Sequence, residues 1–239
     1  MRGPSCRPCD NLHVSLPSLR RLLDISPWAR TLTAAQRARI DESATVRRVP
    51  AGGFVCRKGE SVDHWIGVIE GLVKMANVSA DGKPTTFTGI RDGGWFGEGS
   101  LLKDEPRRYD IVALRDTTAA YIPRATFMAL LDESLAFNRF MLIQLNERLA
   151  QFIGMVEHDR LLGPDARLAR ALASLFNPLL YPDIGPTLPL SQEELGQLIG
   201  VSRQRTNQAL KHLQAAGLIE VDYGRIRVLS LDGLRRHES

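Results

Sequence analysis

The spacing of apolar residues changes near residues 44, 123 and 163, and each change predicts a different kind of structure. From residue 44 to residue 122 apolar and polar positions alternate, which is the period of a half-buried β-strand. Strand-like segments occur at 46–49, 54–57, 65–69, 72–78, 85–88, 111–114 and 119–122. Turn-forming Gly, Pro and Asp separate them, for example at 50–53 and 81–84. Many short strands at this spacing predict an antiparallel sandwich or roll.

After Pro123 the pattern becomes helical. A helix is expected over about 134–159, and its apolar residues follow a 3-4-3-4 spacing along one stripe. The stripe consists of Leu142, Leu145, Leu149, Phe152 and Val156. At 1.5 Å per residue this helix is longer than ~35 Å, which exceeds the length of a small roll. The stripe therefore predicts a homodimer formed through this helix; the alternative is that it only covers the roll.

Gly163 and Pro164 interrupt the helical pattern, because Pro lacks a backbone donor and restricts the residue before it. We place a boundary between two domains there. The expected division is a tail at 1–20, a roll at 21–131, the dimerisation helix at 132–162 and a C-terminal domain at 163–239. The tail is rich in Pro, Ser and Arg and shows no period. A short helix capped by Thr33 is expected before the first strand.

The stretch 190–228 predicts a winged helix-turn-helix. Ser191 and Glu194 form a capping box that starts one short helix, and Gly200 ends it. Ser202 caps a second helix about four residues later, and two helices so close together make a helix-turn-helix. The alternating segments 218–221 and 225–228 then predict a hairpin. The alternative is a generic pair of packed helices followed by a hairpin.

The second of these helices has the chemistry of a DNA-reading element. Between Val201 and His212 it contains no acid, and its outward side chains are long and polar. These side chains are Arg203, Gln204, Arg205, Asn207, Gln208 and Lys211. Arg and Lys bind phosphates, and Arg and Gln near a helix N-terminus can reach base edges in the major groove of double-stranded DNA.

Composition and charge limit the possible classes of protein but do not identify a single one. The chain has 239 residues, 44% hydrophobic content and a net charge of +4, so we expect a globular protein whose mild basicity permits nucleic-acid contact. No apolar run approaches the roughly 20 residues of a spanning helix, and no signal peptide is evident, so we expect a cytoplasmic protein with no membrane partner. The histidines are scattered and no nucleophile motif or phosphate loop occurs, so we expect no enzyme.

The three cysteines raise one alternative. An odd number argues against a secreted disulfide framework. Cys6 and Cys9 form a C-x-x-C motif, which can bind zinc or an iron–sulfur cluster, but a cluster usually takes four thiolates and only Cys56 remains. His13 is the nearest further ligand. We expect no metal, and a redox- or metal-responsive regulator using Cys6 and Cys9 stays as the alternative.

The order of these elements resembles the Crp/Fnr family of bacterial transcription regulators, from about residue 20 to residue 230. The resemblance implies an α+β fold with an antiparallel β-roll (a double-stranded β-helix), a dimerisation helix and a winged helix-turn-helix. It implies a homodimer on a pseudo-palindromic operator and contact with RNA polymerase. Arg203, Gln204 and Gln208 take the base-reading positions, and Ser202 and Thr206 the phosphate contacts. Gln204 and Gln208 replace the family's common Glu and second Arg, so the operator need not match the best-known family site.

A second resemblance concerns the segment 96–107, which is similar to the phosphate-binding cassette of cyclic-nucleotide domains. By that match, Glu98 accepts from a ribose hydroxyl, Arg107 pairs with the cyclic phosphate, and backbone donors near Gly97, Gly99 and Ser100 complete the anion site.

The cassette also departs from the family pattern. Arg108 and Tyr109 follow Arg107 where a small residue is usual, and Phe152 and Ile153 replace hydroxyls that face the base. The effector therefore stays open among three alternatives: cAMP, a cyclic dinucleotide held by Arg107 and Arg108, and no ligand, with Glu98 and Arg107 bracing the roll as an ion pair.

Overall fold

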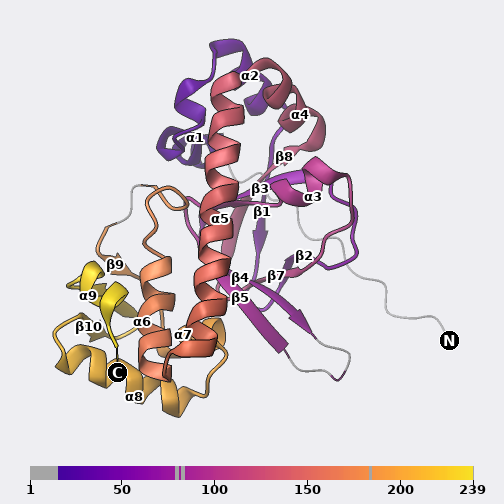
Figure 1. Ribbon diagram of the computed structural model, residues 1–239. Coiled ribbons are helices and arrows are strands. Elements are labelled where there is room, and N and C mark those ends of the chain that lie inside the picture. Colours follow the sequence, from indigo (N-terminus) through magenta and orange to yellow (C-terminus); the bar gives the residue numbers. More distant parts are fainter. Residues whose placement is uncertain (1–15, 79–80, 82–83, 183–184, 239) are drawn as a thin grey trace.

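The computed structural model describes residues 16–78, 81, 84–182 and 185–238, so Cys6, Cys9 and His13 lie outside the described residues. The described part of the chain starts with three helical segments above the roll (Figure 1): α1 (Leu16–Ile25), η1 (Ala29–Thr31) and α2 (Ala34–Ser43). α1 starts inside the stretch expected to be tail, because Leu19, Leu22 and Leu23 are fully buried against the roll. The predicted cap is confirmed: Thr33 and Gln36 form a capping box at the start of α2.

The predicted antiparallel roll is confirmed. Two four-stranded sheets pair in the orders β1-β8-β3-β6 and β2-β7-β4-β5, with every pair antiparallel. The strands are β1 (Thr45–Val49), β2 (Phe54–Cys56), β3 (His64–Glu70), β4 (Leu72–Val78), β5 (Pro84–Arg91), β6 (Trp95–Phe96), β7 (Asp110–Ala113) and β8 (Thr117–Pro123). Two elements were not expected, the two-residue β6 and the short helix α3 (Glu98–Lys103), because neither is long enough to show a period.

An aromatic cluster joins the roll to the helices beside it. The ring centroids of Trp65 and Trp95 are 4.3 Å apart, and Trp28 lies 5.0 Å from Trp65 and 5.4 Å from Phe137. Phe127 completes the cluster from α4 (Arg124–Glu133). Such rings bury a large apolar area. The cluster therefore fixes α4 and the start of the long helix against the roll.

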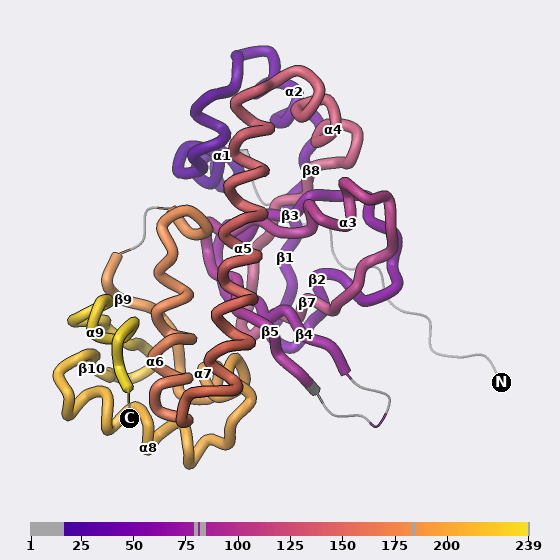
Figure 2. Tube along the Cα trace, viewed as in Figure 1, coloured from indigo at the N-terminus to yellow at the C-terminus, as the bar shows by residue number. Residues whose placement is uncertain are grey.

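The long helix α5 (Leu135–Leu161) runs beside the roll and reaches the C-terminal domain (Figure 2). Ser134 caps it by accepting from the Phe137 backbone N–H. The predicted interruption after it is observed: Gly163 is the N-cap of α6 (Pro164–Ser174), and Pro164 occupies its first position.

The C-terminal domain is a winged helix-turn-helix, as predicted. It contains β9 (Thr187–Leu188), α7 (Gln192–Ile199), α8 (Arg203–Ala215), β10 (Ile219–Asp222), β11 (Arg225–Val228) and α9 (Leu231–Arg236). Ser191 and Glu194 form the expected capping box, and Gly200 ends α7 with a φ of 66°. The third strand of its sheet, β9, was not expected. In the described part of the chain no helix is long and apolar enough to cross a membrane.

The C-terminal domain packs directly on the roll. Gly89 of β5 faces Leu175 and Leu198, and a Cβ at Gly89 would lie 3.1 and 3.0 Å from their methyl groups. Thr86 donates to the Gln197 carbonyl at 2.9 Å. Tyr181, from the segment after α6, is completely buried among roll residues and donates to the Gly89 carbonyl at 2.8 Å. The C-terminal domain therefore has a defined orientation relative to the roll.

Candidate functional site: a DNA-reading helix and an anion-binding cassette

The outer face of α8 is exposed and carries no carboxylate. Arg203, Gln204, Arg205, Gln208 and Lys211 are all exposed. Ala209, Leu210 and Leu213 form the opposite, buried face, which packs in the core of the domain. Arg205 donates to the Gln208 amide oxygen at 3.0 Å, which leaves its remaining donors outward. The helix therefore presents guanidinium, amide and ammonium groups in one surface, as major-groove reading requires.

The two residues expected to contact phosphates have different environments. Ser202 is exposed and caps α8 by accepting from the Arg205 backbone N–H at 3.3 Å. Thr206 is completely buried, donates to the Ser202 carbonyl, and lies against Gly196 of α7. Thr206 therefore packs α7 against α8, and its enclosed hydroxyl is not available to a phosphate. We correct its expected role to one of packing, and Ser202 remains the expected phosphate contact.

The cassette brings Gly97 and Arg107 together. Gly97 has a φ of 100°, and a Cβ there would lie 2.9 Å from Arg107 Nη1, so only glycine fits. Arg107 is 5% exposed, and its Nη2 donates to the His64 carbonyl at 3.0 Å. Its backbone also pairs with Gly59 and Glu60. The guanidinium is thus held inside the roll by neutral partners.

Glu98 is the second buried charge of the cassette. It is 5% exposed, and its Oε2 has no hydrogen-bond partner among the described residues. The ion pair with Arg107 that was one of the expected alternatives is not formed between these two described side chains. A buried carboxylate oxygen without a donor is costly, so this position suits a ligand that brings a hydroxyl or N–H.

Arg108 does not share the cassette interior with Arg107. It is exposed and forms a bidentate ion pair with Glu105 at 2.9 and 2.7 Å. Hydrogen bonds from Arg108 and Lys103 lower the pKa of Glu105 to about 2. Ser100 is buried and Gly99 half-buried, both on α3. The arrangement does not support a ligand that binds Arg107 and Arg108 at the same time.

Arg148 of α5 is a further buried cation beside the cassette. Its Nη2 donates to the Trp95 carbonyl at 3.0 Å, and its Nη1 lies 3.5 Å from the Tyr181 hydroxyl. Burial disfavours the charge, but Tyr181 and Glu98 outweigh it and raise the pKa of Arg148. Burial and the nearby Glu98 raise the pKa of Tyr109 to about 12, so this phenol stays protonated. The interior therefore contains a polar cluster formed by Glu98, Arg107, Tyr109 and Arg148.

The stripe of α5 is exposed as expected at three of its five positions. Leu142, Leu149 and Val156 are 62%, 57% and 48% exposed, and Leu145 is half-buried. Phe152 instead packs against the core of the roll, and Ile153, 60% exposed, continues the stripe. This apolar surface of Leu142, Leu149, Ile153 and Val156 is called the α5 stripe below.

No metal site is found among the described residues, where no group of three or more His, Cys, Asp or Glu side chains converges. Cys56 is buried in β2, and burial raises the pKa of its thiol to about 11. A buried, protonated thiol is a poor metal ligand.

Sequence patterns did not identify Arg148, Tyr181 or the contact between Arg115 and Glu194 described below. Arg148 continues a buried series on α5 that includes Phe137, Met141 and Gln144, and this 4-3-4 spacing was the available signal. Tyr181 lies in an irregular Pro-rich link, where no period exists to indicate burial.

Comparison with known proteins matches both halves of the chain. Residues 46–134 match the cyclic nucleotide-binding domain, and residues 166–237 match the Crp-like helix-turn-helix domain. The transcriptional regulator SdrP of Thermus thermophilus is 29% identical over 175 residues, 72% of this chain and 83% of that protein. The cAMP-activated global transcriptional regulator CRP of Haemophilus influenzae is 26% identical over 178 residues, 73% of this chain and 79% of that protein.

Solved structures show the same fold. FixK2 from Bradyrhizobium japonicum superposes with a TM-score of 0.68 at 16% identity, covering 82% of this chain and 98% of that one. A transcriptional regulator of the Crp/Fnr family from Thermus thermophilus gives a TM-score of 0.55 at 27% identity, covering 80% of this chain and 96% of that one.

Proposed function

Since the chain belongs to the Crp/Fnr family of transcription regulators, we propose that two copies join through the α5 stripe and read a pseudo-palindromic operator with α8. The observation that carries this proposal is the exposed, carboxylate-free face of α8, formed by Arg203, Gln204, Arg205, Gln208 and Lys211. In such a dimer the two recognition helices enter successive major grooves about 34 Å apart. The DNA-bound dimer then acts on transcription through RNA polymerase.

The base-reading roles follow from side-chain chemistry. Arg203 can donate two hydrogen bonds to guanine O6 and N7, and Gln204 or Gln208 can pair with adenine N6 and N7. None of these groups is a carboxylate, which is the usual acceptor for a cytosine amino group. We therefore expect half-sites specified mainly by guanine and adenine contacts.

Selection of bound duplexes from a random-sequence pool tests this function. The expected result is an inverted repeat whose half-sites are one helical turn apart, bound far more tightly than a scrambled duplex of the same composition in fluorescence anisotropy. Recovery of no repeat, together with equal affinity for selected and scrambled duplexes, would contradict the proposal.

A cyclic nucleotide is the effector that the cassette supports best. The supporting observation is the buried Glu98 Oε2 that lacks a donor, in the same cassette as the buried Arg107 guanidinium. Relatives such as the Haemophilus influenzae regulator are cAMP-activated. Titration calorimetry with cAMP should show binding that Glu98→Gln weakens and Arg107→Ala abolishes. If cAMP gave no binding heat with the wild-type protein, or the same binding heat with both variants as with the wild type, the cassette would not bind cAMP.

A further inference from the structure

A second cavity lies between the two domains, away from the cassette. It has a volume of about 350 Å³ and is bounded by β5, α5, α6 and α7. None of the cassette residues lines it. Its size is at the lower end of the range of small-molecule sites, roughly 300–1,000 Å³. It therefore suits a ligand much smaller than a dinucleotide.

One part of the cavity wall is apolar. Leu195 and Leu198 of α7 and Leu175 after α6 are buried, and Phe87 and Met155 are half-buried beside them. These side chains come from the roll, the long helix and the DNA-binding domain. An apolar ligand body in this cavity would therefore contact all three parts of the chain at once.

The other part of the wall has one cation whose charge is not neutralised. Arg167 is paired with Asp159 at 2.6 Å, and Glu147 accepts from Asn177 at 2.9 Å. Arg170 is half-buried, donates to the neutral Leu234 carbonyl at 2.7 Å, and has no carboxylate partner within the described part of the chain. Burial of a cation near apolar side chains favours an anionic partner.

His158 lies beside Arg170 in the same wall. Burial lowers the pKa of His158, and the positive charge of Arg170 lowers it further. The imidazole is therefore neutral at neutral pH and offers one donor and one acceptor. Arg235 also lines the cavity but is paired with Asp232 at 3.3 Å, so Arg170 is the lining cation without a carboxylate partner among the described residues. His158 supplies an additional hydrogen-bonding group.

The cavity stays accessible when the α5 stripe is covered. The lining residues Glu147, Gln151, Gly154 and His158 recur every three or four positions on α5. At about 100° per residue, this series is centred roughly 160° around the helix from the α5 stripe. Dimerisation through the stripe would therefore leave the cavity open to a ligand.

We propose that this cavity binds a small organic acid, with its carboxylate on Arg170 and His158 and its apolar body against Leu195 and Leu198. The regulatory consequence rests on the proposed function: a ligand that contacts β5, α5, α6 and α7 together favours one orientation of the DNA-binding domain over others. Binding and DNA affinity would then be coupled reciprocally.

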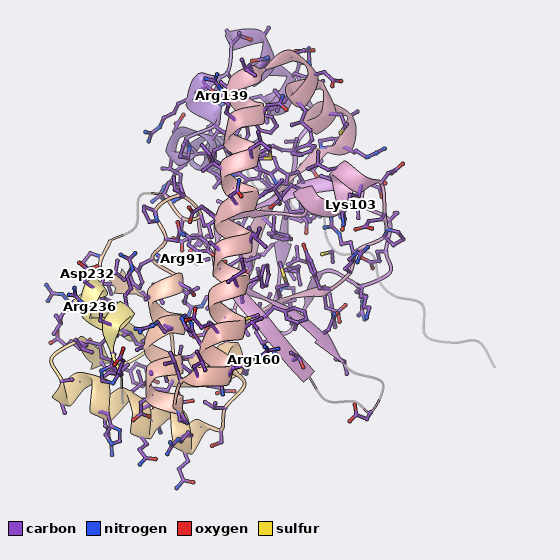
Figure 3. The ribbon with its side chains drawn as sticks, viewed as in Figure 1. Arg91, Lys103, Arg139, Arg160, Asp232 and Arg236 are labelled. Atoms are coloured by element: carbon purple, nitrogen blue, oxygen red, sulfur yellow. The ribbon has the colours of Figure 1, made fainter. Side chains whose placement is uncertain are left out.

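Octanoate and octan-1-ol are the probes for the test, since they share an apolar chain and differ in the anionic head. Ligand-detected NMR on the full chain should show octanoate binding more tightly than octan-1-ol. Arg170→Gln should weaken octanoate by about tenfold and leave octan-1-ol unchanged, because a charge-assisted hydrogen bond is lost. Arg160→Gln is the matched control, because Arg160 (labelled on α5 in Figure 3) is exposed and does not line the cavity. Equal losses in the two variants, or no loss in Arg170→Gln, would overturn the proposal.

Gly154→Leu provides an independent variant that fills the cavity. A Cβ at Gly154 would make only an ordinary 3.6 Å contact with the His158 ring, and leucine favours the helix more than glycine does. Both probes should lose binding, and retained octanoate binding would overturn the site. Saturating octanoate should also shift the dissociation constant for the selected operator by about fivefold. If octanoate binds but the dissociation constant for the operator does not change, the coupling between the two sites would be overturned and the cavity site would stand. If the protein binds no operator at all, the proposed function would be contradicted and the result with the probes would still stand.

Discussion

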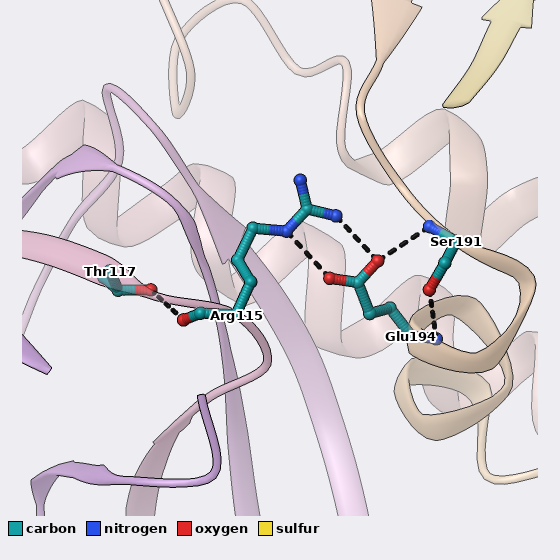
Figure 4. Close-up of polar contacts among 4 residues, drawn as sticks. All are labelled: Arg115, Thr117, Ser191 and Glu194. Atoms are coloured by element: carbon teal, nitrogen blue, oxygen red, sulfur yellow. Dashed lines mark hydrogen bonds and ion pairs between the residues drawn. The ribbon is translucent and has the colours of Figure 1, made fainter. Parts of the chain in front are cut away.

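The Glu194 carboxylate joins Arg115 of the roll to the first helix of the helix-turn-helix. Arg115 Nε and Nη2 donate to its two oxygens at 2.7 and 2.6 Å (Figure 4). One of these oxygens also accepts from the Ser191 backbone N–H at 2.7 Å. The same side chain therefore starts α7 and fixes α7 against the roll. The two side chains are 30% and 14% exposed, so solvent screens the pair only partly.

Breaking this pair should loosen the domain junction without unfolding α7. In Glu194→Gln the amide can still serve the capping box, but the bidentate ion pair is lost. We expect a destabilisation of about 1–2 kcal/mol. Hydrogen exchange should accelerate at the contact between β5 and α7, while α8 stays as protected as in the wild type.

A double-mutant cycle with Arg115→Ala measures the coupling between the two side chains. Glu193→Gln is the matched control, because Glu193 is exposed and forms no ion pair within the described residues. Additive effects of Glu194→Gln and Arg115→Ala on the free energy of unfolding would show that the pair contributes nothing.

The α5 stripe should determine the oligomeric state. Replacing Leu149 and Ile153 by Glu places charges on the exposed apolar surface of α5, and burying these charges in a dimer is costly. We expect a monomeric mass by light scattering, with the circular dichroism spectrum unchanged. Leu179→Glu is the control, since Leu179 is also exposed but lies outside α5. If the double variant still had a dimeric mass, the α5 stripe would not be part of the dimer interface.

Local signals predicted much of this fold. Both capping boxes, Thr33 with Gln36 and Ser191 with Glu194, involve residues three apart and form as the sequence indicates. The recognition helix was equally clear, because its apolar and polar faces lie within α8 and its cap, Ser202, directly precedes it. Features that depend on residues close in sequence are accessible to pattern reasoning.

The features that were missed depend on distant neighbours. Thr206 has the polarity of a phosphate contact, yet Gly196 approaches so closely that the hydroxyl is enclosed. Phe152 and Ile153 are equally apolar, and packing of the roll decides which of them faces outward. Tyr181 is buried only because the C-terminal domain docks on β5. No spacing in the sequence encodes these contacts.

Cys56 should resist alkylation in the folded protein. Burial raises the pKa of its thiol from 9.0 to about 11, so the reactive thiolate is scarce at pH 8. Iodoacetamide should leave the Cys56 peptide unmodified at pH 8 and modify it in urea, as read by mass spectrometry. Labelling of Cys56 in the native protein at the rate of a free thiol would contradict this environment. Because the folded pKa is raised, this thiol's contribution to stability is complete below pH 9 and is lost as the pH rises towards 11.

Arg203 and Lys211 should contribute differently to DNA binding, because a base contact and a phosphate contact have different signatures. Arg203→Ala should weaken binding to the selected operator by about 1–3 kcal/mol and should weaken binding to scrambled duplex very little. The preference for one base pair of the operator should therefore be reduced. Lys211→Ala should weaken both duplexes by a similar factor and reduce the salt dependence of binding by about one counterion. Anisotropy titrations at several salt concentrations separate these effects. Arg160→Gln, on the exposed end of α5 and outside α8, should change neither quantity. If Arg203→Ala weakened selected and scrambled duplexes equally, its side chain would be a phosphate contact, and sequence reading would have to come from Gln204 and Gln208.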